Sequence, residues 1–91
     1  MESENVLLMK ILGNVSRQRI LRIVYGMKKE ICVNEIAKLA DISQSLASHQ
    51  LAYLSAHAVV EGHKMGQTVC YMSNKNELSK RLLKVLNVLT K

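Results

Sequence analysis

The sequence has 91 residues, enough for one small domain, and carries 13 Lys and Arg against 7 Asp and Glu, a formal charge of +6. An excess of this size favours a polyanionic partner such as nucleic acid. No apolar run reaches the roughly 18 residues that cross a membrane. Two cysteines are too few for a secreted disulfide scaffold or a four-thiolate zinc module.

The chain has no linker, repeat or low-complexity stretch, so we expect residues 1–91 to form a single domain. It starts with the acidic segment MESENVLLMKILGN instead of a basic leader and a cleavable apolar stretch. We therefore expect a cytoplasmic protein without a membrane partner. With no Phe or Trp, the core must be mainly aliphatic, and at this length further burial in an oligomer would help.

Two helices are predicted first. Residues 3–13 are apolar on more than one side, as in a helix with several buried faces. A second helix follows, with Ser16 as its N-cap, apolar residues turned inward from Ile20, and Gly26 near its end. Residues 31–33 then form a short β-prone stretch.

A helix-turn-helix pattern comes next. Residues 41–43 are predicted to form a tight turn, and residues 43–57 the helix that enters the major groove of DNA. The helix before the turn is capped by Asn34 and buries Ile36, Ala37, Leu39 and Ala40. The inward stripe of the helix after the turn is Ala47, Leu51, Leu54 and Ala58, at helical spacing.

A hairpin and a terminal helix complete the pattern. Val59–Met65 and Gln67–Ser73 read as two strands around a turn in which Gly66 supplies a positive φ. Apolar residues then recur at helical spacing over residues 76–90. Four helices, a hairpin and a helix predict a mainly helical winged helix-turn-helix with a small β-hairpin wing.

The outward face of the helix at residues 43–57 carries short hydrogen-bonding side chains. Gln44 can make two hydrogen bonds to an adenine edge, and serines and His49 can reach phosphates or bases. The predicted DNA-binding residues are Ser43, Gln44, Ser45, Ser48, His49 and Gln50 on the helix, and His63, Lys64 and Gln67 on the wing. The alternative, a polar surface helix without a partner, is disfavoured by the turn before it and the hairpin after it.

The segments ISQSLASHQL at residues 42–51 and GQTVCY at residues 66–71 resemble the ArsR/SmtB family of bacterial and archaeal regulators. The similarity runs over about residues 8–88 and includes LGNVSRQRIL at residues 12–21 and EICVNEI at residues 30–36. It implies a homodimeric repressor that leaves its operator in double-stranded DNA when an inducer, often a metal ion, binds. We therefore expect a sequence-specific transcriptional regulator that binds an inverted repeat.

The resemblance also implies that the helices at residues 3–13 and 76–90 form the dimer. A terminal helix this rich in leucine independently needs a second surface to cover it. The residues expected in the shared surface are Leu7, Ile11, Leu82, Leu86 and Leu89. The alternative is that both helices only close the core of a monomer.

The metal ligands of the family are not retained. At one metal site of the family, the ligand positions are occupied here by Cys32 and Asn34. At the other site, the first pair of ligand positions is occupied by Lys75 and Glu77, and the second pair lies near Val88 and Lys91. A lysine at a ligand position brings a repelling cation, so we expect no metal, no cofactor and no response to zinc.

Cys32 and Cys70 have two interpretations. The stretch before the third helix of a winged helix commonly pairs with a wing strand, which would bring the thiols together as a redox switch. Alternatively, each is a small buried hydrophobe that stays reduced in the cytosol. A disulfide requires a Cα separation below about 7 Å.

No nucleophile elbow, phosphate loop or pair of spaced carboxylates is present, so we do not expect an enzyme. The alternative function is a winged-helix adaptor that binds proteins and has no specific DNA binding. An adaptor would present an acidic or hydrophobic face at residues 43–57, where this chain is polar and uncharged.

Overall fold

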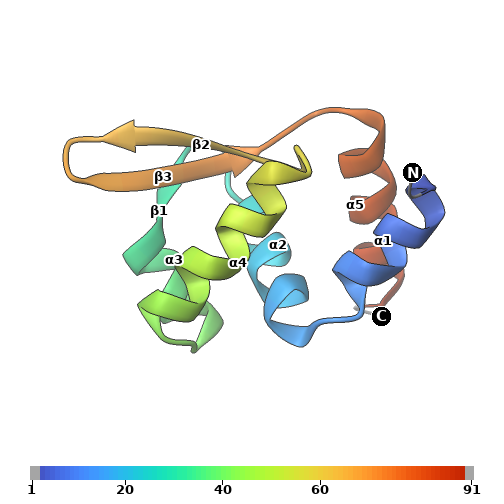
Figure 1. Ribbon diagram of the computed structural model, residues 1–91, viewed down its shortest axis with the longest axis horizontal. Helices are drawn as coiled ribbons and strands as arrows, with labels where there is room; N and C mark the ends of the chain where they lie inside the picture. The colour runs from blue at the N-terminus through green and yellow to red at the C-terminus, as the bar shows by residue number, and fades with distance from the viewer. Residues whose placement is uncertain (1–2, 90–91) are drawn as a thin grey trace.

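The computed structural model describes residues 3–89. Its elements, in chain order, are α1 (Glu4–Leu12), α2 (Val15–Gly26), β1 (Ile31–Cys32), α3 (Val33–Ala40), α4 (Gln44–Ala56), β2 (Val60–Met65), β3 (Thr68–Ser73) and α5 (Glu77–Leu89) (Figure 1). This is the predicted winged helix-turn-helix. The predicted end of the last helix at residue 90, and Lys91, lie outside the described residues.

Side-chain caps fix where the helices begin. Asn14 begins α2, because its Oδ1 accepts a hydrogen bond from the backbone N–H of Arg17 at 3.0 Å. Ser16, the predicted cap, lies inside the helix. An asparagine two residues earlier competes successfully because it caps helices as well as serine does.

The start of α3 also differs from the prediction. Cys32 occupies the N-cap position without a side-chain hydrogen bond, and Asn34 lies in the first turn of the helix. Burial of Val33 at the helix start outweighs the missing cap. Leu39, predicted to be buried, is 59% exposed, because the short helix turns only one face to the core.

The hairpin and β1 form a three-stranded antiparallel sheet in the order β1-β3-β2. Gly66 has the predicted positive φ, 66°, at the first of the two loop positions between Met65 and Thr68. A positive φ at this position is the requirement of a type II′ hairpin turn. Farther down the hairpin, Gly62 pairs with Tyr71, and a Cβ at residue 62 would come within 2.8 Å of the Tyr71 ring. Glycine is therefore needed there to let the ring lie flat across the strand.

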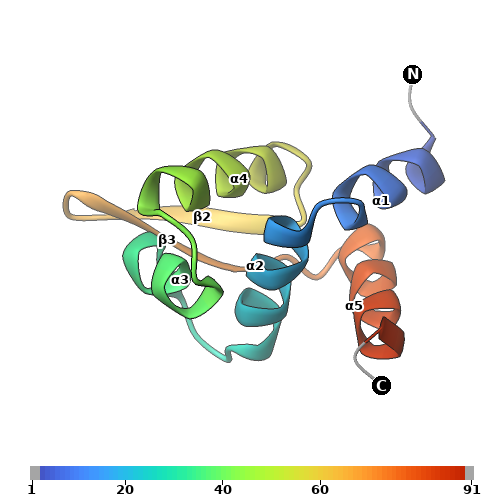
Figure 2. The same ribbon diagram turned by 90° about the horizontal axis from the view of Figure 1, so that it is seen from below.

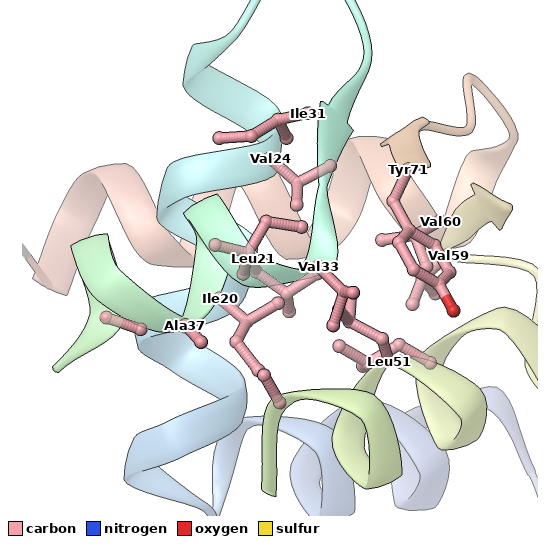
Figure 3. Close-up of a cluster of buried hydrophobic side chains, with 14 of the residues drawn as sticks. Ile20, Leu21, Val24, Ile31, Val33, Ala37, Leu51, Val59, Val60 and Tyr71 are labelled. Carbon is pink, nitrogen blue, oxygen red and sulfur yellow. The ribbon is translucent and has the colours of Figure 1, made fainter. Parts of the chain in front are cut away.

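The core lies between α2, α3, α4 and the sheet. Figure 3 shows side chains from all of these elements meeting there, with Leu21 of α2 between Val24 and Val33 and with Leu51 of α4 facing the sheet. The labelled members are Ile20, Leu21, Val24, Ile31, Val33, Ala37, Leu51, Val59, Val60 and Tyr71. Ala58 is exposed and has a φ of 60°, so it ends α4 and does not extend the inward stripe.

The first and last helices lie together at the end of the molecule opposite the hairpin tip (Figures 1 and 2). Arg81 of α5 bonds Asn5 of α1 at 2.6 Å and forms an ion pair with Glu4 at 2.5 Å. No helix of the described residues is long and apolar enough to span a bilayer.

Three residues expected in the dimer surface belong to the core of the protomer. Ile11, Leu82 and Leu86 are at most 2% exposed, so they have no surface left for a second copy to cover. Periodicity identified the buried face of each helix correctly, but that face packs on the chain itself. Apolar side chains that remain exposed on α1 and α5 are Val6, Met9, Leu83, Val88 and Leu89.

Candidate nucleic-acid interface

A tight turn joins α3 to α4. Asp41 has a left-handed φ of 57°, and the backbone N–H of Ile42 donates to the carbonyl of Ala37 at 3.0 Å. Ser43 then caps α4, its Oγ accepting from the backbone N–H of Leu46 at 3.0 Å. The turn holds the two helices as a helix-turn-helix and leaves the first turn of α4 facing outward.

One face of α4 is polar and exposed, and the other is apolar and buried. Ala47, Leu51 and Leu54 are fully buried, as the helical spacing predicts. The exposed polar residues at the start of the helix are Ser43, Gln44, Ser45, Ser48 and His49, and Leu46 between them is also partly exposed. None is acidic, so the positive end of the helix dipole is not neutralised and the face can approach phosphates and base edges.

Gln50 does not belong to this exposed face. It is 6% exposed, and its Oε1 accepts a hydrogen bond from Nε of Arg17 at 2.8 Å. Three residues after Ala47 and four before Leu54, Gln50 lies on the inward side of α4, which the spacing could have shown. It holds Arg17 and is not available to a base.

Arg17 is a residue that the sequence interpretation missed. Its guanidinium carbon lies 3.8 Å from the ring centroid of Tyr53, and its Nη1 donates to the backbone carbonyl of Lys10 at 3.0 Å. A single side chain of α2 thus contacts both the end of α1 and the inner side of α4. No sequence signal separated it from the neighbouring arginines, which point outward.

The wing carries the other predicted DNA-binding residues. His63, Lys64 and Gln67 are all exposed on the hairpin, close to its turn. Nε2 of His63 lies 2.7 Å from a carboxylate oxygen of Glu61, two residues away on the same strand. Lys64 has no partner among residues 3–89 and so keeps its charge free for phosphate.

Cys32 and Cys70 face each other across β1 and β3. They are register partners with a Cα separation of 3.7 Å, and a disulfide joins them. The pairing of the stretch before α3 with a wing strand is therefore observed. No group of three or more His, Cys, Asp or Glu gathers as a metal site within residues 3–89.

A family model described as bacterial regulatory protein, arsR family, matches residues 14–60. The cadmium resistance transcriptional regulatory protein CadC of Listeria innocua is 37% identical over 82 residues, which cover 88% of this chain and 60% of that protein. A Halobacterium salinarum protein, named as a putative arsenical resistance operon repressor ArsR, gives a shorter match. It is 38% identical over 56 residues, which cover 62% of this chain and 43% of that protein. The chain thus spans less than two thirds of these two relatives.

The transcriptional activator HlyU of Vibrio cholerae is 32% identical over 82 residues, 90% of this chain and 73% of that protein. Its solved structure has a TM-score of 0.81 at 28% identity and covers 100% of both chains. A homodimeric winged helix-turn-helix DNA-binding domain from Mycobacterium bovis has a TM-score of 0.78 at 23% identity, over 96% of this chain and 79% of the other.

These matches confirm the family resemblance and the winged fold. The region matched by the family model holds α2, α3 and α4, which carry the helix-turn-helix. By its sequence and its fold, the chain belongs to the arsR family of bacterial regulatory proteins, which are DNA-binding transcriptional regulators and not enzymes.

Proposed function

We propose that the chain binds an inverted-repeat operator in double-stranded DNA as a homodimer, with α4 in the major groove and the wing on the backbone. The observation that carries the proposal is the uncharged, exposed row of hydrogen-bonding side chains that begins directly after the turn. Side chains of this kind can discriminate base edges by their hydrogen-bonding pattern, whereas a contact to phosphate carries no sequence information. In a symmetric dimer the two copies of α4 would enter successive major grooves.

The test separates sequence readout from general affinity. Gln44→Ala and His49→Ala are each expected to cost roughly 1 to 3 kcal/mol on the operator and little on a scrambled duplex. Binding to both duplexes is measured at two salt concentrations, starting from DNA upstream of the protein's own gene. Equal losses on both duplexes, or on neither, would mean that α4 does not read sequence and would favour a protein-binding adaptor.

Lys64→Ala is the matched comparison on the wing. Because Lys64 offers a charge and no base-specific pattern, its loss should weaken both duplexes about equally. The slope of log affinity against log salt should fall by about one unit per protomer. An effect confined to the operator would instead assign sequence readout to the wing.

We infer that the dimer forms through Val6 and Met9 of α1 and Val88 and Leu89 of α5, which are exposed apolar residues. Met9 of α1 is 63% exposed and Leu89 of α5 is 52% exposed. The two helices lie at the end of the molecule away from the wing (Figure 2). Sedimentation at micromolar concentration should give twice the chain mass of 10.2 kDa, and Met9→Lys with Leu89→Lys should give the monomer. Leu39→Lys, at an equally exposed leucine of α3, should leave the dimer intact.

We propose further that the protein is a repressor and acts in the cytoplasm, where the operator lies. The name of the Halobacterium relative supports repression, while HlyU is named an activator. Deletion of the gene should raise expression of a reporter fused to the operator. A fall in expression would identify an activator.

A further inference from the structure

A cavity of about 210 Å³ lies on the side of the molecule where α2 ends and α5 begins. Its apolar walls come from the ring of Tyr25 and from Leu83, which is 42% exposed. The apolar wall continues past these two residues into a second cavity of about 260 Å³, which they also line. The combined groove could cover an apolar body the size of one or two aromatic rings.

Two of the hydroxyls that line the first cavity, those of Tyr25 and Ser79, already form hydrogen bonds within the protein. The Tyr25 hydroxyl donates to the Val59 carbonyl at 3.1 Å, and Oγ of Ser79 donates to the same carbonyl at 3.3 Å. Burial raises the pKa of Tyr25 above its ordinary value of 10.0, and a side-chain hydrogen bond with Ser79 lowers it by less. The hydroxyl therefore stays protonated. These two hydroxyls therefore offer little free hydrogen bonding to a ligand, and the other uncharged polar residues of the lining are Ser73 and Asn74.

The charged side chains that line the cavity are two lysines. Lys75 and Lys80 line the cavity and are both exposed. Their side chains form no hydrogen bond or ion pair with any residue from 3 to 89, and the backbone N–H of Lys80 donates to the Asn76 carbonyl within the first turn of α5. No acidic side chain is among the described residues that line it. Two unpaired cationic side chains above an apolar slot repel a cationic ligand. A neutral ligand would leave both lysine charges without a counter-charge.

We propose that this cavity binds a small organic anion, with an apolar body between Tyr25 and Leu83 and a carboxylate at Lys75 and Lys80. The apolar walls supply the contact area, since apolar burial is the main source of affinity in small-molecule sites. The lysines supply the selection for negative charge. The site is separate from the exposed face of α4, and its existence does not depend on DNA binding.

The probe is naphthalene carboxylate, with naphthalene carboxamide as the neutral ligand of the same shape. Titration of the isotopically labelled full chain should give saturable shifts of the backbone amides of Tyr25, Ser79 and Leu83. The carboxylate should bind on the order of fivefold more tightly than the amide, because the two cationic side chains are exposed to solvent and each contributes modestly.

Matched variants separate the two parts of the site. The double variant Lys75→Gln with Lys80→Gln should reduce carboxylate affinity to that of the amide. The control is Lys84→Gln, which removes one positive charge from α5 at a position outside the cavity and should have no effect. Leu83→Asn should weaken both ligands. The proposal is overturned if neither ligand shifts these amides, which is the result expected when a second copy of the chain covers the groove. It is also overturned if the two ligands bind equally. The third contrary result is that Lys84→Gln weakens binding as much as the double variant does.

Discussion

Replacing Arg17 by methionine is expected to lower the free energy of unfolding by roughly 2 to 4 kcal/mol, a large loss for a domain of this size. Part of the loss is the contact of the guanidinium with the Tyr53 ring. The larger part comes from Gln50, whose buried Oε1 would keep no donor after the substitution. A buried polar atom without a partner costs more than an average hydrogen bond contributes.

Urea unfolding at fixed protein concentration measures this loss. Arg19→Met is the matched control, because Arg19 lies two residues along the same helix and makes only one long hydrogen bond, 3.4 Å, to the carbonyl of Ala40. The control should change stability by less than about 1 kcal/mol. Similar losses in the two variants would show that only the charge of α2 matters and that the contacts of Arg17 contribute nothing.

A second substitution tests the reason given for the effect. If the unpaired Gln50 causes most of the loss, Gln50→Met in the Arg17→Met background should recover about half of it, because the orphaned acceptor is removed at similar volume. Gln50→Met alone should destabilise the wild-type protein. A double variant no more stable than Arg17→Met would assign the loss to the Tyr53 contact and to the bond with the Lys10 carbonyl.

Periodicity and turn chemistry were sufficient to predict the architecture. The predicted helix at residues 43–57 is observed as Gln44–Ala56, because Ser43 is both a good cap and the first polar residue before the buried stripe. The hairpin turn was predicted at residues 64–67, and the observed loop, Gly66 and Gln67, lies one position later, because Gly66 takes its positive φ at the first loop position. Local signals of this kind fix elements, and their order fixes a small fold.

What could not be predicted depends on contacts between distant segments. An inward leucine such as Leu82 looks the same in sequence whether its own chain or a partner covers it, so the buried residues of α5 were assigned to the dimer. Gln50 was grouped with the exposed polar residues by residue type, although its spacing from Ala47 and Leu54 indicates the inward side. Its partner, Arg17, lies 33 positions earlier in the chain and could not be predicted. The roles of the exposed residues in DNA binding remain predictions, which the duplex experiments test.

The disulfide joins two segments that the helix-turn-helix separates. Cys32 directly precedes α3, and Cys70 lies in β3, so α3, α4 and β2 all lie between the two cysteines. Cys70 is also the register partner of His63 on the outer wing strand. Closing the bond therefore ties the start of the helix-turn-helix to the middle of the wing.

Reduction of this bond is expected to lower the free energy of unfolding by roughly 2 to 4 kcal/mol. The cysteines are 38 positions apart, and a link over a loop of that length removes considerable freedom from the unfolded chain. Urea unfolding with and without dithiothreitol measures the difference, and intact mass checks that the oxidised form lacks two hydrogens. Cys32→Ala, which cannot form the bond, should be indifferent to the reductant.

The same two samples test whether the bond regulates the protein. If the wing must be held against α3 to reach the DNA backbone, the reduced form should bind the operator several-fold more weakly at a temperature where both forms are folded. Cys32→Ala should match the reduced form with or without dithiothreitol. Equal DNA affinity of the oxidised and reduced wild-type protein would reject a redox switch and leave the bond a purely structural role. If the two forms were also equally stable, Cys32 and Cys70 would act only as small core residues.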